Sequence, residues 1–170
     1  KNSLLKLGGL RKPSCAKDGY TAATPPFSFV PKWRNYLKSV ANFALDNIGN
    51  LISTNSIANT MTSDGRSINV RTVEKYLEGF IESFFLYKAN RYDIKGKQYL
   101  KTGEKYYVSD LGLRYFMLGR KVGDRGHILE NVVYLELLRR GYDVYIGKVD
   151  DFEVDFVAID STGKRYVQVC

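Results

Sequence analysis

The sequence lacks the features typical of membrane, secreted or disulfide-linked proteins. It contains no run of about 18 apolar residues, so no transmembrane helix is expected, and its N-terminus carries no apolar signal core. Its two cysteines, Cys15 and Cys170, lie at opposite ends and form no disulfide or metal-binding pattern. We therefore expect a cytoplasmic chain with no membrane partner.

A phosphate-binding loop is also missing. No stretch matches G-x-x-x-x-G-K-[ST], in which backbone N–H groups and a lysine hold nucleotide phosphates, and the pair Gly8-Gly9 is no substitute. We therefore expect no ATP binding by this route, and no cofactor within this chain unless Mg²⁺ binds at the carboxylates described below.

Basic residues exceed acidic residues, 26 against 18, for a net charge of +8. The excess lies in residues 1–31 and 32–110, whereas residues 111–170 hold nine residues of each sign. A basic excess favours anionic partners such as double-stranded DNA, although solvated surface lysines with no partner would give the same count.

The organisation of the chain is indicated by its Gly and Pro residues and by the periodicity of its apolar residues. Residues 1–31 are rich in Gly and Pro without sustained periodicity, which indicates a linker or irregular arm. A helical period begins at Trp33, carried by Leu37, Val40, Ala44, Ile48 and Leu51. The polar connector at 121–124 is the best boundary between a domain at 32–120 and a second at 121–170.

The segment 32–120 has the element order of a winged helix. A second short helix follows a cap at Thr54 or Asn55, and a third begins after its cap at Asn69. Period-two stretches then predict a hairpin around residues 95–97 and a further strand at 106–108 after a turn at Gly103. Three helices followed by a hairpin indicate a winged helix, and Asp110 opens one more helix that ends near Gly119.

A winged helix can bind DNA or join proteins. For DNA binding, the third helix would supply the groove contacts and the wing the phosphate contacts. Glu74, Glu78 and Glu82 lie on the same helix and would repel phosphate, which favours a docking role. The predicted nucleic-acid contacts are Arg71, Thr72, Lys75, Lys95, Lys97 and Lys101.

The last third of the chain carries two acids in apolar surroundings. A helix at about 127–140 holds Glu130 on one face with Val133, Tyr134 and Leu137, and His127 lies one turn earlier. Three strands are expected next, at about 142–146, 152–159 and 165–170.

Strand alternation places the polar residues of these strands on common faces. Glu153 and Asp155 should point to one side of their strand, with Phe156 on the other. Gln168 and Cys170 likewise share a face. One helix followed by three such strands can bring Glu130, Asp155, Gln168 and Cys170 to one point.

Carboxylates so arranged suit phosphodiester hydrolysis. Their oxygens hold Mg²⁺, the metal activates water, and a lysine orients the nucleophile. Glu130 and Asp155 are therefore candidate metal ligands. The alternative is a buried structural pair, with His127 as a third member, because a buried carboxylate must be paired, protonated or metal-bound.

The chain resembles the C-terminal region of a family of uncharacterised prokaryotic AAA-type ATPases, which joins a winged helix to a restriction-endonuclease-like domain. The resemblance covers about residues 32–170. It rests on the strings LDNIGNLIS, SINVRTVEKYLEGF, LYKANRYDIKGKQYLKT, EKYYVSDLGLR, GHILENVVYLELLRRGYDVYIGK and EVDFVA. The implied fold is α+β, a winged helix followed by a partial α/β domain with a mixed sheet. ATP would be bound only by the parent's missing domain.

The resemblance also assigns the site. The motif glutamate falls on Glu130, the motif aspartate on Asp155, and the closing acid-x-lysine on Gln168-Val169-Cys170. Here the chain departs twice, because Gln168 is neutral and Cys170 supplies no fixed cation.

These departures lead us to expect a degenerate site in a module that binds DNA, the parent ATPase domain or another protein. A divergent metal-dependent DNase is the alternative, in which Lys148 or Lys164 replaces the lost lysine. A purely protein-docking domain is the third possibility.

Overall fold

The structure, a computed structural model, describes residues 31–96, 98–119 and 123–170, with only the backbone for 98–102. Pro31–Cys170 form one compact unit. The arm expected at residues 1–31 lies outside the described part of the chain except for Pro31.

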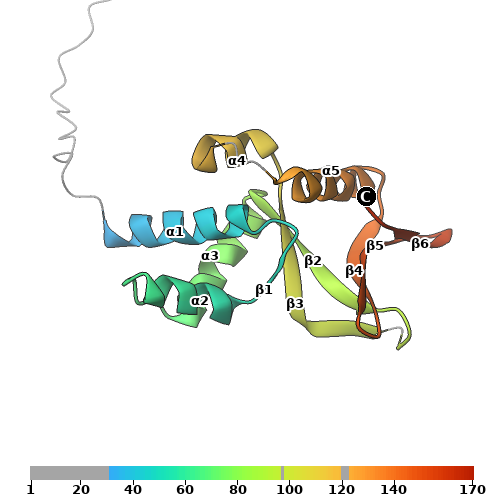
Figure 1. Ribbon diagram of the computed structural model, residues 1–170, viewed down its shortest axis with the longest axis horizontal. Helices are drawn as coiled ribbons and strands as arrows, with labels where there is room; N and C mark the ends of the chain where they lie inside the picture. The colour runs from blue at the N-terminus through green and yellow to red at the C-terminus, as the bar shows by residue number, and fades with distance from the viewer. Residues whose placement is uncertain (1–30, 97, 120–122) are drawn as a thin grey trace, which may run out of the picture. The chain divides into compact units, whose positions relative to one another are not determined.

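Five helices and six strands are described (Figure 1). In chain order they are α1 (Lys32–Asp46), β1 (Leu51–Ile52), α2 (Thr54–Ser63), α3 (Val70–Glu82), β2 (Leu86–Asp93), β3 (Gln98–Val108), α4 (Leu111–Leu118), α5 (Arg125–Arg139), β4 (Asp143–Val149), β5 (Phe152–Asp160) and β6 (Gly163–Val167). The class is α+β, as predicted.

Local capping residues set the helix starts. Asn69 accepts a hydrogen bond from the N–H of Arg71 at the start of α3, and Asp110 accepts from Gly112 at the start of α4. Both were predicted from sequence. For α2 the cap is Ser53 rather than Thr54 or Asn55, because Ser53 and Ser56 form a reciprocal capping box.

The strands form one mixed sheet in the order β1-β3-β2-β4-β5-β6. All neighbours are antiparallel except β2 and β4, which pair in parallel through residues 91–93 and 146–148. The strands of segment 121–170 therefore extend the sheet of segment 32–120, and the boundary predicted at 121–124 does not divide two compact units.

The β2–β3 hairpin contributes to two hydrophobic cores. One core fills the space between α1, α2, α3 and the hairpin and includes Leu77, Tyr106 and Val108. The other lies under α5 and includes Tyr107 and Phe156. Because successive residues of β3 alternate between these cores, the strand links the helical bundle to the last third of the chain.

Three element boundaries differ from the sequence predictions. Leu51 belongs to β1, held by pairing with Lys105 of β3, and does not extend α1. β3 continues through Gly103, which sits at a register shift with φ of 79° rather than in a turn between two strands. β6 ends at Val167, so Gln168 and Cys170 follow the strand.

None of the described helices combines the length and apolar character needed to cross a membrane.

Candidate functional site

Glu130 lies in a buried group of polar side chains between α5 and β3. The residue is 9% exposed. Its Oε1 accepts a hydrogen bond from the hydroxyl of Tyr107 at 2.6 Å and lies 3.1 Å from Nζ of Lys105. The charge of Glu130 is therefore balanced by a cation supplied from another element.

Lys105 and Tyr107 come from one face of β3, two residues apart. Lys105 is 4% exposed and also forms an ion pair with Glu153 of β5. Two strands separate β3 from β5 in the sheet, so this pair crosses the side that faces α5. A lysine this deeply buried requires anionic partners, and Glu130 and Glu153 supply two.

The hydroxyl of Tyr107 is held in its protonated form. Burial raises its pKa well above the usual value near 10, and the hydrogen bond to Glu130 raises it further. Tyr107 therefore acts as a permanent donor to the carboxylate.

Two more residues of α5 fix this helix on β3. Asn131 is fully buried, and its amide accepts from the N–H of Val108 at 2.8 Å and donates to the carbonyl of Val108 at 2.9 Å. One turn along, the ring of Tyr134 stacks on Tyr107 with centroids 4.2 Å apart.

Gly49, in the turn after α1, closes the other side of the group. Its φ is 73°, and a Cβ at this position would lie 3.2 Å from Nδ1 of His127 and 3.3 Å from Oε2 of Glu130. His127 is thus near Glu130, as its helical spacing predicted. Nδ1 of His127 is buried and has no hydrogen-bond partner among the described residues.

Asp155 is held separately, by the segment that follows β6. Its Oδ2 accepts from Nε2 of Gln168 and from the N–H of Val169, each at 2.7 Å. The predicted proximity of Asp155 and Gln168 is confirmed. Gln168 faces the carboxylate with its amide nitrogen, so it acts as a donor to Asp155 and not as a third oxygen ligand.

A β-bulge in β5 changes the predicted faces. Between the pairs Val154–Gly147 and Val157–Tyr145, β5 has one residue more than β4. Phe156 consequently packs against Tyr134 in the core under α5, at 5.8 Å between ring centroids, on the side where Glu153 meets Lys105. Strict alternation predicted that Phe156 would point away from Glu153. This prediction was wrong, because the bulge brings both side chains to the same side of the sheet.

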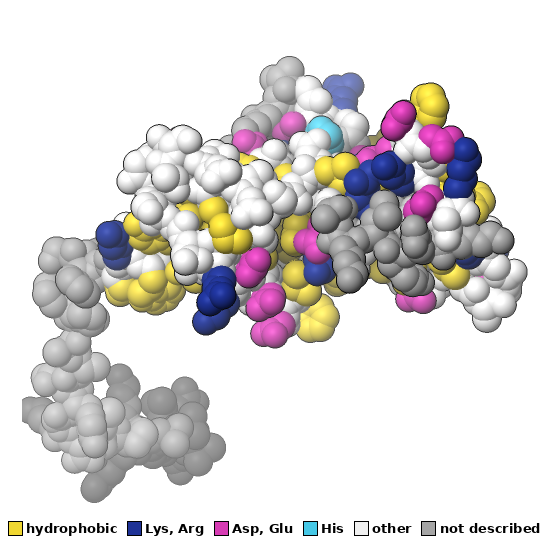
Figure 2. Space-filling model, turned by 90° about the horizontal axis from the view of Figure 1, so that it is seen from below, with side chains coloured by type: hydrophobic (Ala, Val, Ile, Leu, Met, Phe, Trp, Pro, Cys, Tyr) yellow, Lys and Arg dark blue, Asp and Glu magenta, His cyan; other side chains and the backbone are white. Residues whose placement is uncertain are grey.

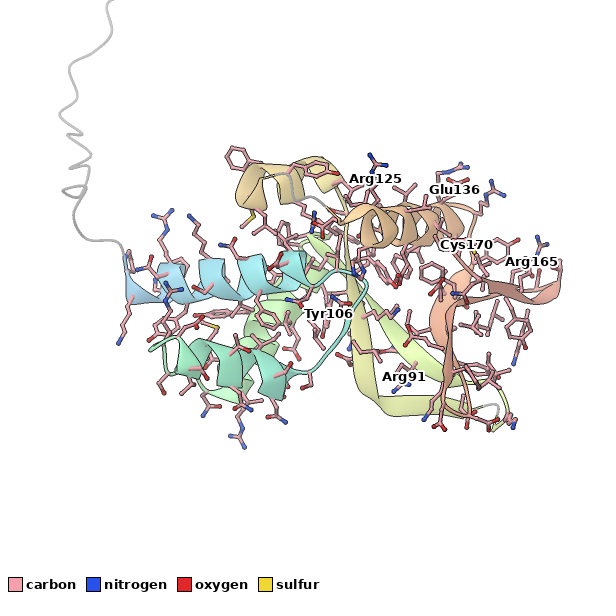
Figure 3. All side chains as sticks on the ribbon, in the orientation of Figure 1. Arg91, Tyr106, Arg125, Glu136, Arg165 and Cys170 are labelled. Atoms are coloured by element: carbon pink, nitrogen blue, oxygen red, sulfur yellow. The ribbon has the colours of Figure 1, made fainter. Side chains whose placement is uncertain are left out.

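The carboxylate oxygens of Glu130 and Asp155, as arranged here, do not fit a Mg²⁺ site. Oε1 of Glu130 is occupied by Lys105 and Tyr107, and Oδ2 of Asp155 by two N–H donors. No group of three or more His, Cys, Asp or Glu side chains within the described ranges is placed to hold a metal ion. Cys170 is exposed with a free thiol, and Figure 3 places it beneath α5.

The lysine of the site was not predicted. Lys164 lies over the ring of Tyr92 at 4.5 Å, and Lys148 lines a small cavity with Asp93, Lys95 and Asp150. Lys105 instead reaches Glu130. The signal available in sequence was its position two residues before Tyr107, next to the apolar stretch Tyr106–Val108.

The residues predicted to contact nucleic acid differ in exposure and in their partners. Arg71 and Lys75 are exposed on α3, and Thr72 is half-buried. Lys95 forms an ion pair with Asp150, between β4 and β5. Lys97 and the side chain of Lys101 lie outside the described residues.

Acidic side chains line the cleft between α3 and the hairpin. Glu74 and Glu78 of α3 and Glu104 of β3 border a cavity of about 360 Å³. Lys88 lies there also, paired with Glu104 at 3.2 Å. Tyr106, labelled in Figure 3, donates to Glu104 from the side of the hairpin that faces the helices.

The fold and site define an α+β protein whose helical bundle and α5 share one sheet, with a lysine-neutralised glutamate where they meet. The chain belongs to the family described as a domain of unknown function, DUF8612, whose model matches residues 31–123.

Two curated prokaryotic relatives match most of the chain. An uncharacterized protein of Haemophilus influenzae is 47% identical over 133 residues, which is 78% of this chain and 33% of that protein. The uncharacterized protein MJ1544 of Methanocaldococcus jannaschii is 33% identical over 138 residues, 79% of this chain and 30% of that protein. The chain thus spans about a third of the length of these relatives. No solved structure matches significantly.

Proposed function

We propose that this chain is the C-terminal part of an AAA-type ATP-binding protein and serves as a non-cleaving binding module for a protein partner or for DNA. The observation that carries the proposal is the pairing of Glu130 with Lys105 and Tyr107. A nuclease glutamate needs free oxygens for a metal, whereas this carboxylate is neutralised from within.

The element order supports a winged helix as the binding part. The order α1-β1-α2-α3-β2-β3, with β1 antiparallel to β3 on the outer edge of the hairpin, is compatible with the three helices and hairpin expected of a winged helix. The relatives are about three times longer than the matched segment, which leaves room for an ATP-binding domain elsewhere in them.

Charge favours protein docking over DNA within this proposal. Glu74 and Glu78 line the cleft beside the helix that would enter the groove, and Lys95 of the wing is paired with Asp150. On the face shown in Figure 2, basic and acidic side chains are interspersed among the described residues. DNA remains the second candidate partner because the net charge is +8.

Incubation with supercoiled plasmid and Mg²⁺ or Mn²⁺ tests the loss of cleavage. We expect the plasmid to stay intact, as with Glu130→Ala and Asp155→Ala. Cleavage by the wild-type chain that both substitutions abolish would contradict the proposal and establish a metal-dependent DNase.

Fluorescence anisotropy with labelled duplex DNA separates the two partner classes. If the partner is a protein, the anisotropy of the labelled DNA should not rise at physiological salt. The double substitution Arg71→Glu with Lys75→Glu should then leave the anisotropy unchanged. Salt-dependent binding that this double substitution removes, but that Arg140→Glu on the exposed end of α5 leaves intact, would identify DNA as the ligand.

A further inference from the structure

An apolar groove runs between α1, the end of α3 and α4. Its volume is about 840 Å³. Its described lining residues are Trp33, Arg34, Leu37, Lys38, Ala41, Phe80, Ser83, Phe85, Phe116 and Met117. The groove is separate from the site around Glu130.

The floor of the groove is a stripe along α1. Trp33, Leu37 and Ala41 are spaced four residues apart, so they lie on one face over about 12 Å of helix. Phe116 of α4 forms part of the opposite wall. Trp33 is 55% exposed and Phe116 is 89% exposed, more than two large aromatic side chains usually leave in water at one place.

The charges at the groove have one sign. Arg34 and Lys38 repeat at the same four-residue spacing beside the apolar stripe, and both are exposed. No acidic residue is among the described residues that line the groove. The groove thus offers a ridge of apolar side chains flanked by a row of cations.

We infer that this groove docks an amphipathic helix of a partner polypeptide, with apolar residues against Trp33, Leu37 and Phe116 and acidic residues against Arg34 and Lys38. A helix packs along such an i, i+4 stripe through its own i, i+4 ridge. The inference rests on the binding role proposed above and adds the surface and the chemistry of the partner.

Trp33 is the single tryptophan of the chain and lines this groove, so its fluorescence reports on binding here. It also lines a cavity with Tyr36, Asn69 and Thr72, so the substitutions below are needed to locate the peptide. The probe is a designed amphipathic helical peptide without tryptophan, carrying leucines at i, i+4 and i+7 and glutamates beside them. Docking predicts a saturable blue shift of the Trp33 emission. A peptide with lysines in place of the glutamates should bind at least about tenfold more weakly.

Matched substitutions locate the binding surface. Phe116→Glu should weaken peptide binding about tenfold or more. Phe152→Glu, at a position 77% exposed and outside the groove, should leave it unchanged. Both sites are on the surface, so circular dichroism should show a native fold for each variant.

Three outcomes would overturn the inference. The first is no shift with the acidic peptide. The second is a shift that follows protein concentration alone with a doubled mass in ultracentrifugation, which would make a second copy the occupant. The third is a shift produced by duplex DNA and not by peptide. In each of these cases the plasmid of the cleavage experiment above would stay intact, so the non-cleaving role would still hold. Failure of the non-cleaving role itself would appear as plasmid cleavage.

Discussion

At the scale of residues, Lys105, Tyr107 and Glu130 form a buried group in which the carboxylate receives two donors and the cation has two acids. Removing one partner of such a group leaves the other charge buried without compensation. This differs from exposed ion pairs such as Glu136 with Arg139, which contribute little.

Substitution of Lys105 measures this buried charge. We expect Lys105→Met to lower the free energy of unfolding by about 3 kcal/mol, because Glu130 then stays buried without a cation. The double variant Lys105→Met with Glu130→Gln should recover more than half of that loss. Urea unfolding measures both, and equal losses in the single and double variants would show that the charge of Glu130 is not what Lys105 offsets.

Gly49 is required for the approach of the chain to Glu130. Gly49→Ala should destabilise the fold by about 2 kcal/mol, from a positive φ and from crowding of His127 and Glu130. Gly65→Ala is the matched control, since its φ is 75° and nothing lies within 4 Å of its added Cβ. Thermal unfolding should rank Gly49→Ala below Gly65→Ala, and the reverse order would argue against close packing at Gly49.

Alkaline pH should unfold the protein through its buried tyrosines. Burial raises the pKa of Tyr106, Tyr107 and Tyr134 above the usual value near 10, with hydrogen bonds to Glu104 and Glu130 adding for the first two. Above pH 10 the unfolded state releases these protons while the native state keeps them. Stability therefore falls as pH rises, by up to about 1.4 kcal/mol per pH unit for each tyrosine.

Tyrosine ionisation can be followed by ultraviolet absorbance alongside circular dichroism. Part of the absorbance change of the thirteen tyrosines should appear only together with unfolding. Reversible ionisation of all of them near pH 10 with the fold intact would contradict the buried positions.

At the scale of elements, the docking of α5 depends on Asn131. Its amide replaces a strand partner at Val108, where the outer edge of β3 extends beyond its pairing with β1. This pair of hydrogen bonds ties the helix to the backbone of β3 rather than to a side chain that could repack.

Truncation of this side chain should loosen the helix. Asn131→Ala should cost about 2–3 kcal/mol, because a buried N–H and a buried carbonyl both lose their partner. Asn55→Ala, on the exposed first turn of α2, provides the same chemical change without buried partners. Amide hydrogen exchange should accelerate at Val108 in the first variant only, and unchanged protection there would exclude the predicted role of Asn131.

The elements that sequence predicted correctly have local causes. Asn69 and Asp110 cap their helices through bonds to residues two positions away, so a short window contains the whole signal. The prediction that Leu51 continues the first helix was wrong, because β1 exists only through pairing with β3, more than fifty residues later. The predicted face of Phe156 was wrong because strict alternation assumes a strand without a bulge, and a bulge depends on both paired strands.

At the scale of the whole molecule, β3 carries the coupling between the two cores. Tyr106 and Tyr107 are neighbours in sequence and lie in different cores. Glu130, Asp155 and Gln168 could be identified from sequence, and the contact of Asp155 with Gln168 follows from that prediction. The contact of Lys105 with Glu130 could not be predicted, since it joins residues 25 positions apart on β3 and α5, and no local pattern specifies how this helix packs on the sheet.

Titration of the chain with Mn²⁺ in a calorimeter tests the central claim most directly, namely that oxygens of Glu130 and Asp155 are occupied by donors from within the chain and hold no catalytic metal. The account predicts no saturable heat in the millimolar range for the wild-type chain, and none for Glu130→Gln or Asp155→Asn. Saturable binding of one ion by the wild-type chain, lost in both variants while their circular dichroism stays native, would contradict it.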